Sequence, residues 1–149
     1  IVHMGYFQPF SASMQGVIAH AATGSLGNIT HAHYRNAHHA AYGRWFDSAD
    51  VNWFTKPDLA GGGAFMDMGT HAVHRLCSAL GTVDRVMATI GNAAGIYPDV
   101  DDHGIAWLSF ANGALYLCVL FFNSFPPMSS GGIATSHGRW AYFDSQWFG

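Results

Sequence analysis

Residues 62–80 carry an amphipathic helical pattern, and this segment constrains the fold more than any other. At about 100° per residue, apolar side chains fall on one side of the predicted helix and polar side chains on the opposite side. The apolar side consists of Phe65, Met68, Ala72, Leu76 and Ala79, and the polar side of Asp67, His71, His74 and Ser78. We therefore expect one side of the helix to pack on a sheet and the other to present a carboxylate and two imidazoles.

The segments around this helix predict an α+β domain. Ser11 or Ser13 is expected to cap an earlier helix that stops at Gly24. Strands are predicted over residues 1–7, 29–34, 83–90, 102–110, 114–122, 133–135 and 140–143. Tight turns at Asn112-Gly113 and His137-Gly138 join two pairs of these strands as hairpins. Two early helices followed by a run of strands are typical of an α+β layer.

Two connecting segments stand out by their composition. Residues 36–62 are predicted to be a long loop, and its aromatic side chains indicate packing rather than disorder. Asp99, Asp101 and Asp102 form an acidic turn before a predicted strand. We interpret this turn as solvated, because a calcium loop needs more oxygen ligands at regular spacing.

Composition and charge exclude several classes of protein. The 149 residues fit one domain, half of them are apolar, and a net charge of −3 with no basic run predicts no nucleic-acid partner. The longest apolar stretch, residues 114–122, is too short to cross a membrane. Cys77 and Cys118 lie in apolar patterns, which predicts buried thiols without a disulfide framework. A reducing, cytoplasmic location is therefore expected.

Asp67 and His71 are the strongest candidates for chemistry. They are four residues apart on the predicted helix, so their side chains are neighbours. Histidine titrates near neutral pH and can accept a proton from a substrate hydroxyl, while the aspartate can orient the substrate or the imidazole. The helix dipole favours the ionised aspartate near the helix N-terminus. The spacing alone favours a solvated ion pair on an ordinary helix.

The wider pattern around this pair resembles the Gfo/Idh/MocA family of oxidoreductases. The central match runs from Trp53-Phe54 through Pro57 and Ala60-Gly61-Gly62-Gly63-Ala64 to Asp67-x-Gly69-x-His71. Upstream it includes Phe10-Ser11-x-Ser13 and Thr23-Gly24-x-Leu26-Gly27-x-Ile29, and downstream Asp101-Asp102, Phe110-Ala111-Asn112-Gly113-Ala114 and residues 133–143. The resemblance thus covers nearly the whole chain.

The resemblance implies the substrate domain of an NAD- or NADP-dependent oxidoreductase that acts on a sugar, cyclitol or similar polyol. It implies a mainly antiparallel open sheet with helices packed on one face, and no nucleotide-binding Rossmann domain in this chain. His71 would be the acid/base residue and Asp67 would orient the substrate. The family also uses a lysine in a Glu-Lys-Pro motif. This sequence has no glutamate, and its single lysine, Lys56, does not match that position.

The resemblance also implies a domain division. Residues 1–8 would be the last strand of a truncated nucleotide-binding domain, and residues 9–149 a substrate-binding and oligomerisation domain truncated at its C-terminus. The cofactor-binding residues stay unknown, because no Gly-x-Gly-x-x-Gly follows a predicted strand. Both ends of the chain are interpreted as cuts through a larger protein, since it opens in an apolar run and ends among aromatic residues.

Further polar and aromatic residues are candidates for substrate binding. We single out Arg35, His38 and Trp53, and His74, which stands where family members often have an aspartate. Histidines also cluster near one strand end, at positions His31, His33, His38 and His39. Together with His71 and His74 they could form a metal site, but no cysteine pair or His-Glu-x-x-His motif supports one. We expect no metal.

Three functions stay open at this point. The leading hypothesis is the oxidoreductase substrate domain described above, with a small-molecule polyol as substrate. The second is a non-catalytic binding or assembly module on the same fold, because fold alone does not fix function. In both cases the open face of the sheet predicts a homo-oligomer. The third is a histidine-rich metal protein.

Overall fold

The structure is a computed structural model of the 149-residue chain. It describes every residue except 3, 25–26, 122–127, 137–139 and 145–149. The longer elements are α1 (Ala12–Thr23), β1 (Ile29–Ala37), α3 (Ala64–Leu80), β2 (Val83–Gly91), β3 (His103–Phe110), β4 (Leu115–Phe121), β5 (Met128–Thr135) and β6 (Trp140–Asp144). Shorter ones are η1 (Gln8–Phe10), η2 (Asn52–Thr55) and α2 (Pro57–Ala60). None of the helices among the described residues is long and apolar enough to cross a membrane.

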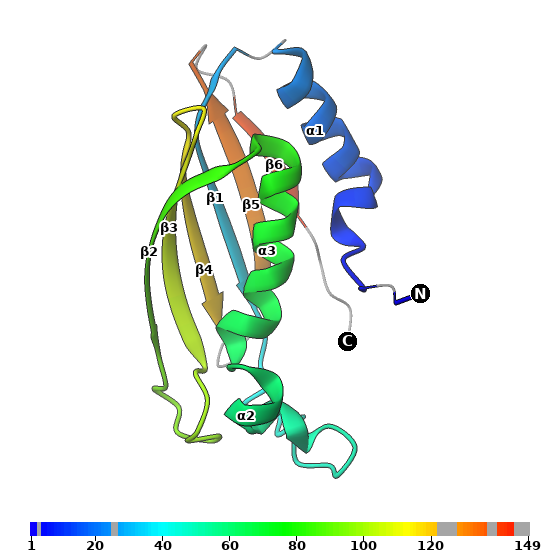
Figure 1. Ribbon diagram of the computed structural model, residues 1–149, viewed down its shortest axis with the longest axis vertical. Helices are drawn as coiled ribbons and strands as arrows, with labels where there is room; N and C mark the ends of the chain where they lie inside the picture. The colour runs from blue at the N-terminus through cyan, green and yellow to red at the C-terminus, as the bar shows by residue number, and fades with distance from the viewer. Residues whose placement is uncertain (3, 25–26, 122–127, 137–139, 145–149) are drawn as a thin grey trace.

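The described strands form one sheet of six in the order β2-β3-β4-β1-β5-β6. All neighbours pair antiparallel except β1 and β4, which run parallel. The chain leaves β1, passes through α3 and returns through the meander β2-β3-β4, which brings β4 beside β1. Both long helices lie on one face of this sheet (Figure 1). The expected α+β fold, with a mainly antiparallel open sheet and helices on one face, is confirmed.

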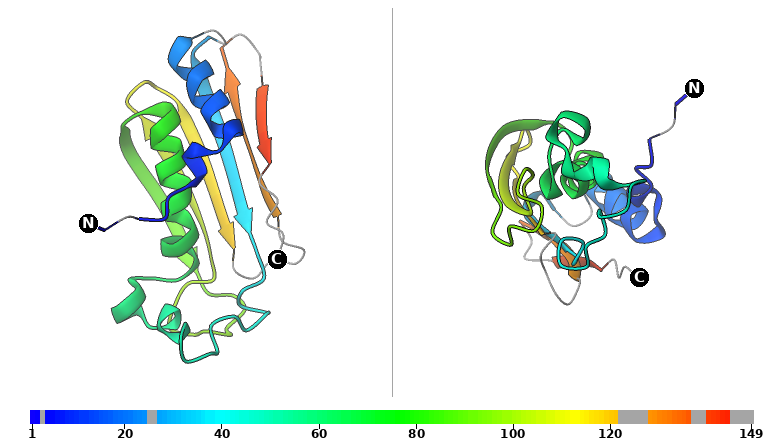
Figure 2. Two further views of the ribbon diagram at one scale, coloured as in Figure 1. Left: turned by 90° about the vertical axis from the view of Figure 1, so that its right-hand side faces the viewer. Right: turned by 90° about the horizontal axis from the view of Figure 1, so that it is seen from below.

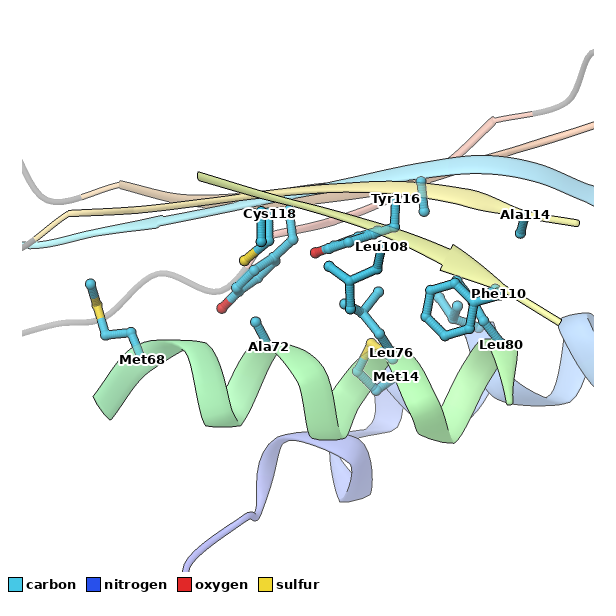
Figure 3. Packing of buried hydrophobic residues seen from close by; sticks show 14 of the residues in the cluster. Met14, Met68, Ala72, Leu76, Leu80, Leu108, Phe110, Ala114, Tyr116 and Cys118 are labelled. Atoms are coloured by element: carbon cyan, nitrogen blue, oxygen red, sulfur yellow. The ribbon is translucent and has the colours of Figure 1, made fainter. Parts of the chain in front are cut away.

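The core lies between α3, α1 and the covered face of the sheet. Met68, Ala72, Leu76 and Leu80 project from α3 toward Leu108, Phe110, Tyr116 and Cys118 of β3 and β4, and Met14 of α1 joins them (Figure 3). Along β3 the even-numbered residues are buried, whereas Ile105 and Trp107 are exposed on the opposite face. Both cysteines are free thiols, and burial raises the pKa of Cys118 to about 12. The sheet therefore buries one face and leaves the other open.

Local sequence explains where the helices begin and end. The Ser11 side chain accepts a hydrogen bond from the backbone N–H of Met14, which caps α1. Gly24 then ends α1 in the left-handed conformation, with φ of 63°. A four-residue turn through Asn112 and Gly113 (φ 87°) joins β3 to β4, as the hairpin signal predicts. The His137-Gly138 turn lies outside the described residues.

Two predictions about elements are wrong. Residues 1–7 contain no strand in their described part, because they have no sheet to pair with and instead run toward α3. Residues 36–62 are not one loop, since β1 extends to Ala37 and the segment contains η2 and α2. Helix α3 also begins at Ala64 rather than at residue 62. The proposed division into residues 1–8 and 9–149 stays a prediction.

Candidate active site

The N-terminus of α3 is fixed by Asp101, which lies before β3. Its carboxylate accepts hydrogen bonds from the backbone N–H groups of Gly63 and Phe65, each at 2.7 Å. Its backbone carbonyl accepts a third from Ala64 at 2.9 Å. A Cβ atom at Gly63 would overlap this carbonyl, so only glycine allows the approach. The acidic turn is thus not simply solvated, because one of its members satisfies the free N–H groups of α3.

The neighbouring Asp102 holds a second part of the same turn. Its buried carboxylate accepts hydrogen bonds from the backbone N–H groups of Ala93 and Ala94, and it lies 2.6 Å from Nδ1 of His103. These bonds outweigh the effect of burial and lower the pKa of Asp102. Together the two aspartates tie the segment before β3 to both α3 and the end of β2.

Asp67 lies in the first turn of α3, on the side of the helix away from its buried residues. Its side chain is partly buried, and burial raises the pKa of Asp67, while the nearby His71 acts in the opposite direction. The helix dipole was expected to favour the ionised form of Asp67, but the effect of burial on its pKa is larger. None of the ion pairs among the described residues joins Asp67 to His71. The two groups are neighbours on one stripe rather than a closed salt bridge.

His71 and His74 follow on the same stripe and are covered by the N-terminal segment. The Tyr6 ring packs against His71 with centroids 5.4 Å apart at 80°, and against His74 at 4.9 Å and 39°. Phe7 lies 6.4 Å from His71. In each imidazole Nδ1 is buried without a hydrogen-bond partner among the described residues, whereas Nε2 is not buried. The accessible nitrogen of His71 is therefore Nε2.

The structure does not bring Arg35 to this stripe. In β1 its neighbours Tyr34 and Asn36 are buried on the covered face, and the Arg75 guanidinium of α3 lies 4.9 Å from the Tyr34 ring centroid. Because side chains alternate along a strand, Arg35 lies on the open face of the sheet. His31 and His33 lie on that face with it, away from His71 and His74.

His38 and Trp53 belong to the segment between β1 and α3. This segment lies near the N-terminal end of α3, at one end of the sheet (Figure 1). His38 stacks on Trp45 at 5.2 Å, and its Nδ1 accepts a hydrogen bond from the backbone N–H of Ala40. Burial and the neighbouring His39 lower the pKa of His38 to about 4, so it is neutral at pH 7. Trp53 stacks on Phe54 and is partly exposed.

No metal cluster appears within the described ranges, where no group of three or more histidine, cysteine, aspartate or glutamate side chains converges. The sheet separates His31 and His33 from His71 and His74, so these four histidines do not meet at one site.

The comparison with protein families shows to which family the chain belongs. The profile of the GFO/IDH/MocA C-terminal domain matches residues 14–140. The chain belongs to the GFO/IDH/MocA family. A search of curated proteins finds no match.

Solved structures of other proteins share the fold of this GFO/IDH/MocA domain. An inositol dehydrogenase homologue from Azotobacter vinelandii, complexed with NAD+, is 20% identical with a TM-score of 0.78 over 89% of this chain and 36% of its own. The WlbA dehydrogenase from Bordetella pertussis, in complex with NADH and UDP-GlcNAcA, is 25% identical with a TM-score of 0.72 over 84% of this chain and 37% of its own. A levoglucosan dehydrogenase in complex with NADH is 22% identical with a TM-score of 0.78 over 97% and 40%. The chain thus spans less than half the length of these structures.

Sequence reasoning missed two features of this GFO/IDH/MocA domain. The first is the cap that the Asp101 carboxylate forms on the N-terminus of α3. The acidic turn before β3 does not predict this cap, because the N–H groups that it binds lie far away in the sequence. The second is the contact of Tyr6 with two histidines of α3. No local pattern marks it, because it depends on how the N-terminal segment crosses the helix.

Proposed function

We propose that the chain is the substrate domain of an NAD- or NADP-dependent oxidoreductase that acts on a hydroxyl of a sugar, cyclitol or similar polyol. His71 is the acid/base residue and Asp67 orients the substrate. The observation that carries the proposal is the accessible Nε2 of His71 beside the partly buried Asp67, on the side of α3 away from the sheet. Family membership and the cofactors and sugars in the similar structures support it.

The proton and the hydride leave the substrate by different routes in this proposal. A bound nicotinamide cofactor supplies the hydride acceptor for the carbinol carbon. Nε2 of His71 accepts the hydroxyl proton as the carbon–oxygen double bond forms, and returns it in the reverse reaction. The carboxyl of Asp67, one turn earlier on α3, accepts a hydrogen bond from a substrate hydroxyl and fixes the substrate at His71.

The residues of this chain fit such a cofactor at its reactive end only. Nε2 of His71 is not among the buried nitrogens that lack a partner, so it is the atom proposed to face a substrate and a nicotinamide ring. The glycines at 61–63 do not form a phosphate cradle, because Gly61 ends α2 with φ of 79° and Gly63 packs on Asp101. The dinucleotide is therefore proposed to bind mainly to another part of the parent protein.

The remaining substrate-binding candidates differ in how well geometry supports them. His74 lies one turn after His71 and shares its contact with Tyr6, which supports a place at the edge of the pocket. His38 is neutral at pH 7, and because its Nδ1 accepts from Ala40 its proton lies on Nε2. Trp53 offers a partly exposed ring. Arg35 lies on the other face of the sheet, which weakens its candidacy.

Replacing His71 tests the proposal directly. In the full-length protein, with NAD or NADP and a panel of polyols, His71→Ala should lower kcat by roughly 10²- to 10⁴-fold, the usual contribution of a general acid or base. His20→Ala is the matched control, because His20 is exposed near the end of α1 and distant in the chain from the stripe. Turnover in His71→Ala equal to that of the control would remove the acid/base role.

A second function is favoured by the open face of the sheet. Apolar side chains are exposed there on β3 and β4, among them Ile105, Trp107 and Leu115, with Met87 on the neighbouring β2. Exposed apolar patches of this kind mark interfaces between proteins. We therefore also propose that this face joins copies of the chain in a homo-oligomer. A non-catalytic assembly module would keep this face without needing His71.

A cytoplasmic location stays a prediction from the two free thiols.

A further inference from the structure

Tyr6 is the aromatic residue that contacts both imidazoles of the polar stripe on α3. It lies edge-on to His71, with an interplanar angle of 80°, and tilted at 39° over His74. Both ring centroids lie within 5.4 Å of the tyrosine ring. Figure 2 shows the N-terminal segment that carries this tyrosine crossing α3 before the chain enters α1. A residue from outside the helix therefore packs on the proposed acid/base group.

The segment after Tyr6 is anchored, so the contact has a structural support. Gln8 and Pro9 are buried in η1, which contacts α3. The carbonyl of Pro9 accepts a hydrogen bond from Nε2 of Gln15 at 2.7 Å, and the carbonyl of Gln8 accepts one from Oγ of Ser11 at 2.9 Å. These bonds fasten the segment to the first turns of α1. They fix where Tyr6 and Phe7 leave the anchor and meet α3.

Among the residues that the structure describes, none forms a hydrogen bond that holds the imidazole of His71. A histidine that handles protons is usually oriented by a partner on its second nitrogen, which also selects the tautomer. Here Nδ1 of His71 is buried without such a partner among the described residues. The rings of Tyr6 and Phe7, at 5.4 and 6.4 Å, are the aromatic contacts that restrict its rotation. Packing takes the place of the orienting hydrogen bond.

We propose that Tyr6 is a positioning residue that holds the His71 imidazole with Nε2 facing the substrate. This inference rests on the proposed function and deepens it, because it names a residue that acts on substrate only through His71. The contact needs the ring of the tyrosine and not its hydroxyl. Without the ring, the imidazole can rotate about its Cβ–Cγ bond and present either nitrogen.

Kinetics of the full-length protein test the role. Tyr6→Ala should lower kcat by roughly tenfold to a hundredfold, the cost of a misplaced catalytic group, while KM stays within about twofold. Tyr6→Phe should restore the rate, since it keeps the ring. Phe10→Ala is the matched control, because Phe10 is exposed on the same segment. A fall in Tyr6→Phe equal to that in Tyr6→Ala, or an unchanged kcat in Tyr6→Ala, overturns the positioning role.

A second measurement separates this inference from the proposed function. The ring nitrogens of His71, assigned by ¹⁵N NMR with His71→Ala as reference, report its tautomer and mobility without any turnover. Tyr6→Ala should shift and broaden these signals, and Tyr6→Phe should leave them in place. Unchanged signals in Tyr6→Ala overturn the positioning role whatever the rates are. Normal turnover in His71→Ala with a shifted signal in Tyr6→Ala instead overturns the proposed acid/base role.

Discussion

His38 is held in its neutral form by burial and by the neighbouring His39. It stacks on Trp45, accepts a hydrogen bond from the backbone N–H of Ala40 through Nδ1, and lies beside His39. Protonation would place a second proton against the Ala40 N–H and a charge in a buried site. Burial is the largest cause of its pKa of about 4, and the neighbouring His39 lowers the pKa further. A partly buried neutral histidine of this kind links folding to pH.

We predict that this linkage lowers stability as the pH falls. Between pH 6.5 and about 4 the unfolded chain protonates His38 and the folded chain does not, so the free energy of unfolding decreases with falling pH. The full effect is at most about 3 kcal/mol, and it is absent above pH 6.5. His38→Asn keeps an acceptor for Ala40 and cannot be protonated. Urea unfolding from pH 7 to pH 4.5 should therefore show a shallower pH dependence in His38→Asn.

The control for that prediction is His20→Asn, since His20 is exposed on α1. It should unfold with the pH dependence of the unmodified protein. An equal slope in His38→Asn and the unmodified protein would contradict the assignment of the linkage to His38.

Single residues differ in how far the sequence predicts their place. The stripe of Asp67, His71 and His74 follows from helical periodicity, and α3 confirms it. Strand periodicity equally assigns Arg35 to the face opposite Tyr34, once Tyr34 is known to be buried. The contact of Tyr6 with His71 does not follow from any local period, because it joins segments far apart in the chain. Such contacts depend on packing that only the folded chain defines.

At the scale of elements, α3 depends on a residue outside itself. Its N-terminal cap position is Gly63, which has no side chain to accept the free N–H groups. Asp101 supplies the carboxylate instead, from the segment between β2 and β3. The sequence predicts α3 and the strands around it within a few residues, because each carries its own period. It does not predict this cap, nor that residues 1–7 lack a strand, because both depend on partners elsewhere.

We predict that Asp101→Ala destabilises the protein and disturbs the site. The backbone N–H groups of Gly63 and Phe65 lose their acceptor, and loss of a helix cap typically costs about 1–2 kcal/mol. Denaturant unfolding measures this loss. Asp99→Ala is the matched control, since Asp99 is exposed in the same turn. If both variants unfold at the same denaturant concentration, the cap does not stabilise α3.

At the scale of the whole molecule, the described helices cover one face of the sheet. Helices α1 and α3 lie on that face in every view, and the opposite face has no described element against it (Figure 2). Strand register places Met87, Trp107 and Leu117 in one row across the open face. The alternation of β3 predicts such a face, but only the sheet order reveals that the exposed apolar residues of three strands lie together.

We predict that Trp107→Glu weakens self-association through this face. Trp107 is 52% exposed, so its replacement removes little of the core, while a charge in the middle of an apolar row opposes burial against a second copy. A central aromatic residue of an interface typically contributes about 2 kcal/mol, so the dimer Kd in sedimentation equilibrium should rise roughly thirtyfold. Leu59→Glu is the control, because Leu59 is exposed on α2 and lies outside the sheet. His71 lies on the side of the sheet that the helices cover. Turnover per active site therefore tests the acid/base role of His71 separately from self-association through the open face.

A protein that is monomeric at every concentration, or a Trp107→Glu variant that associates as tightly as Leu59→Glu, would contradict the open face as the interface.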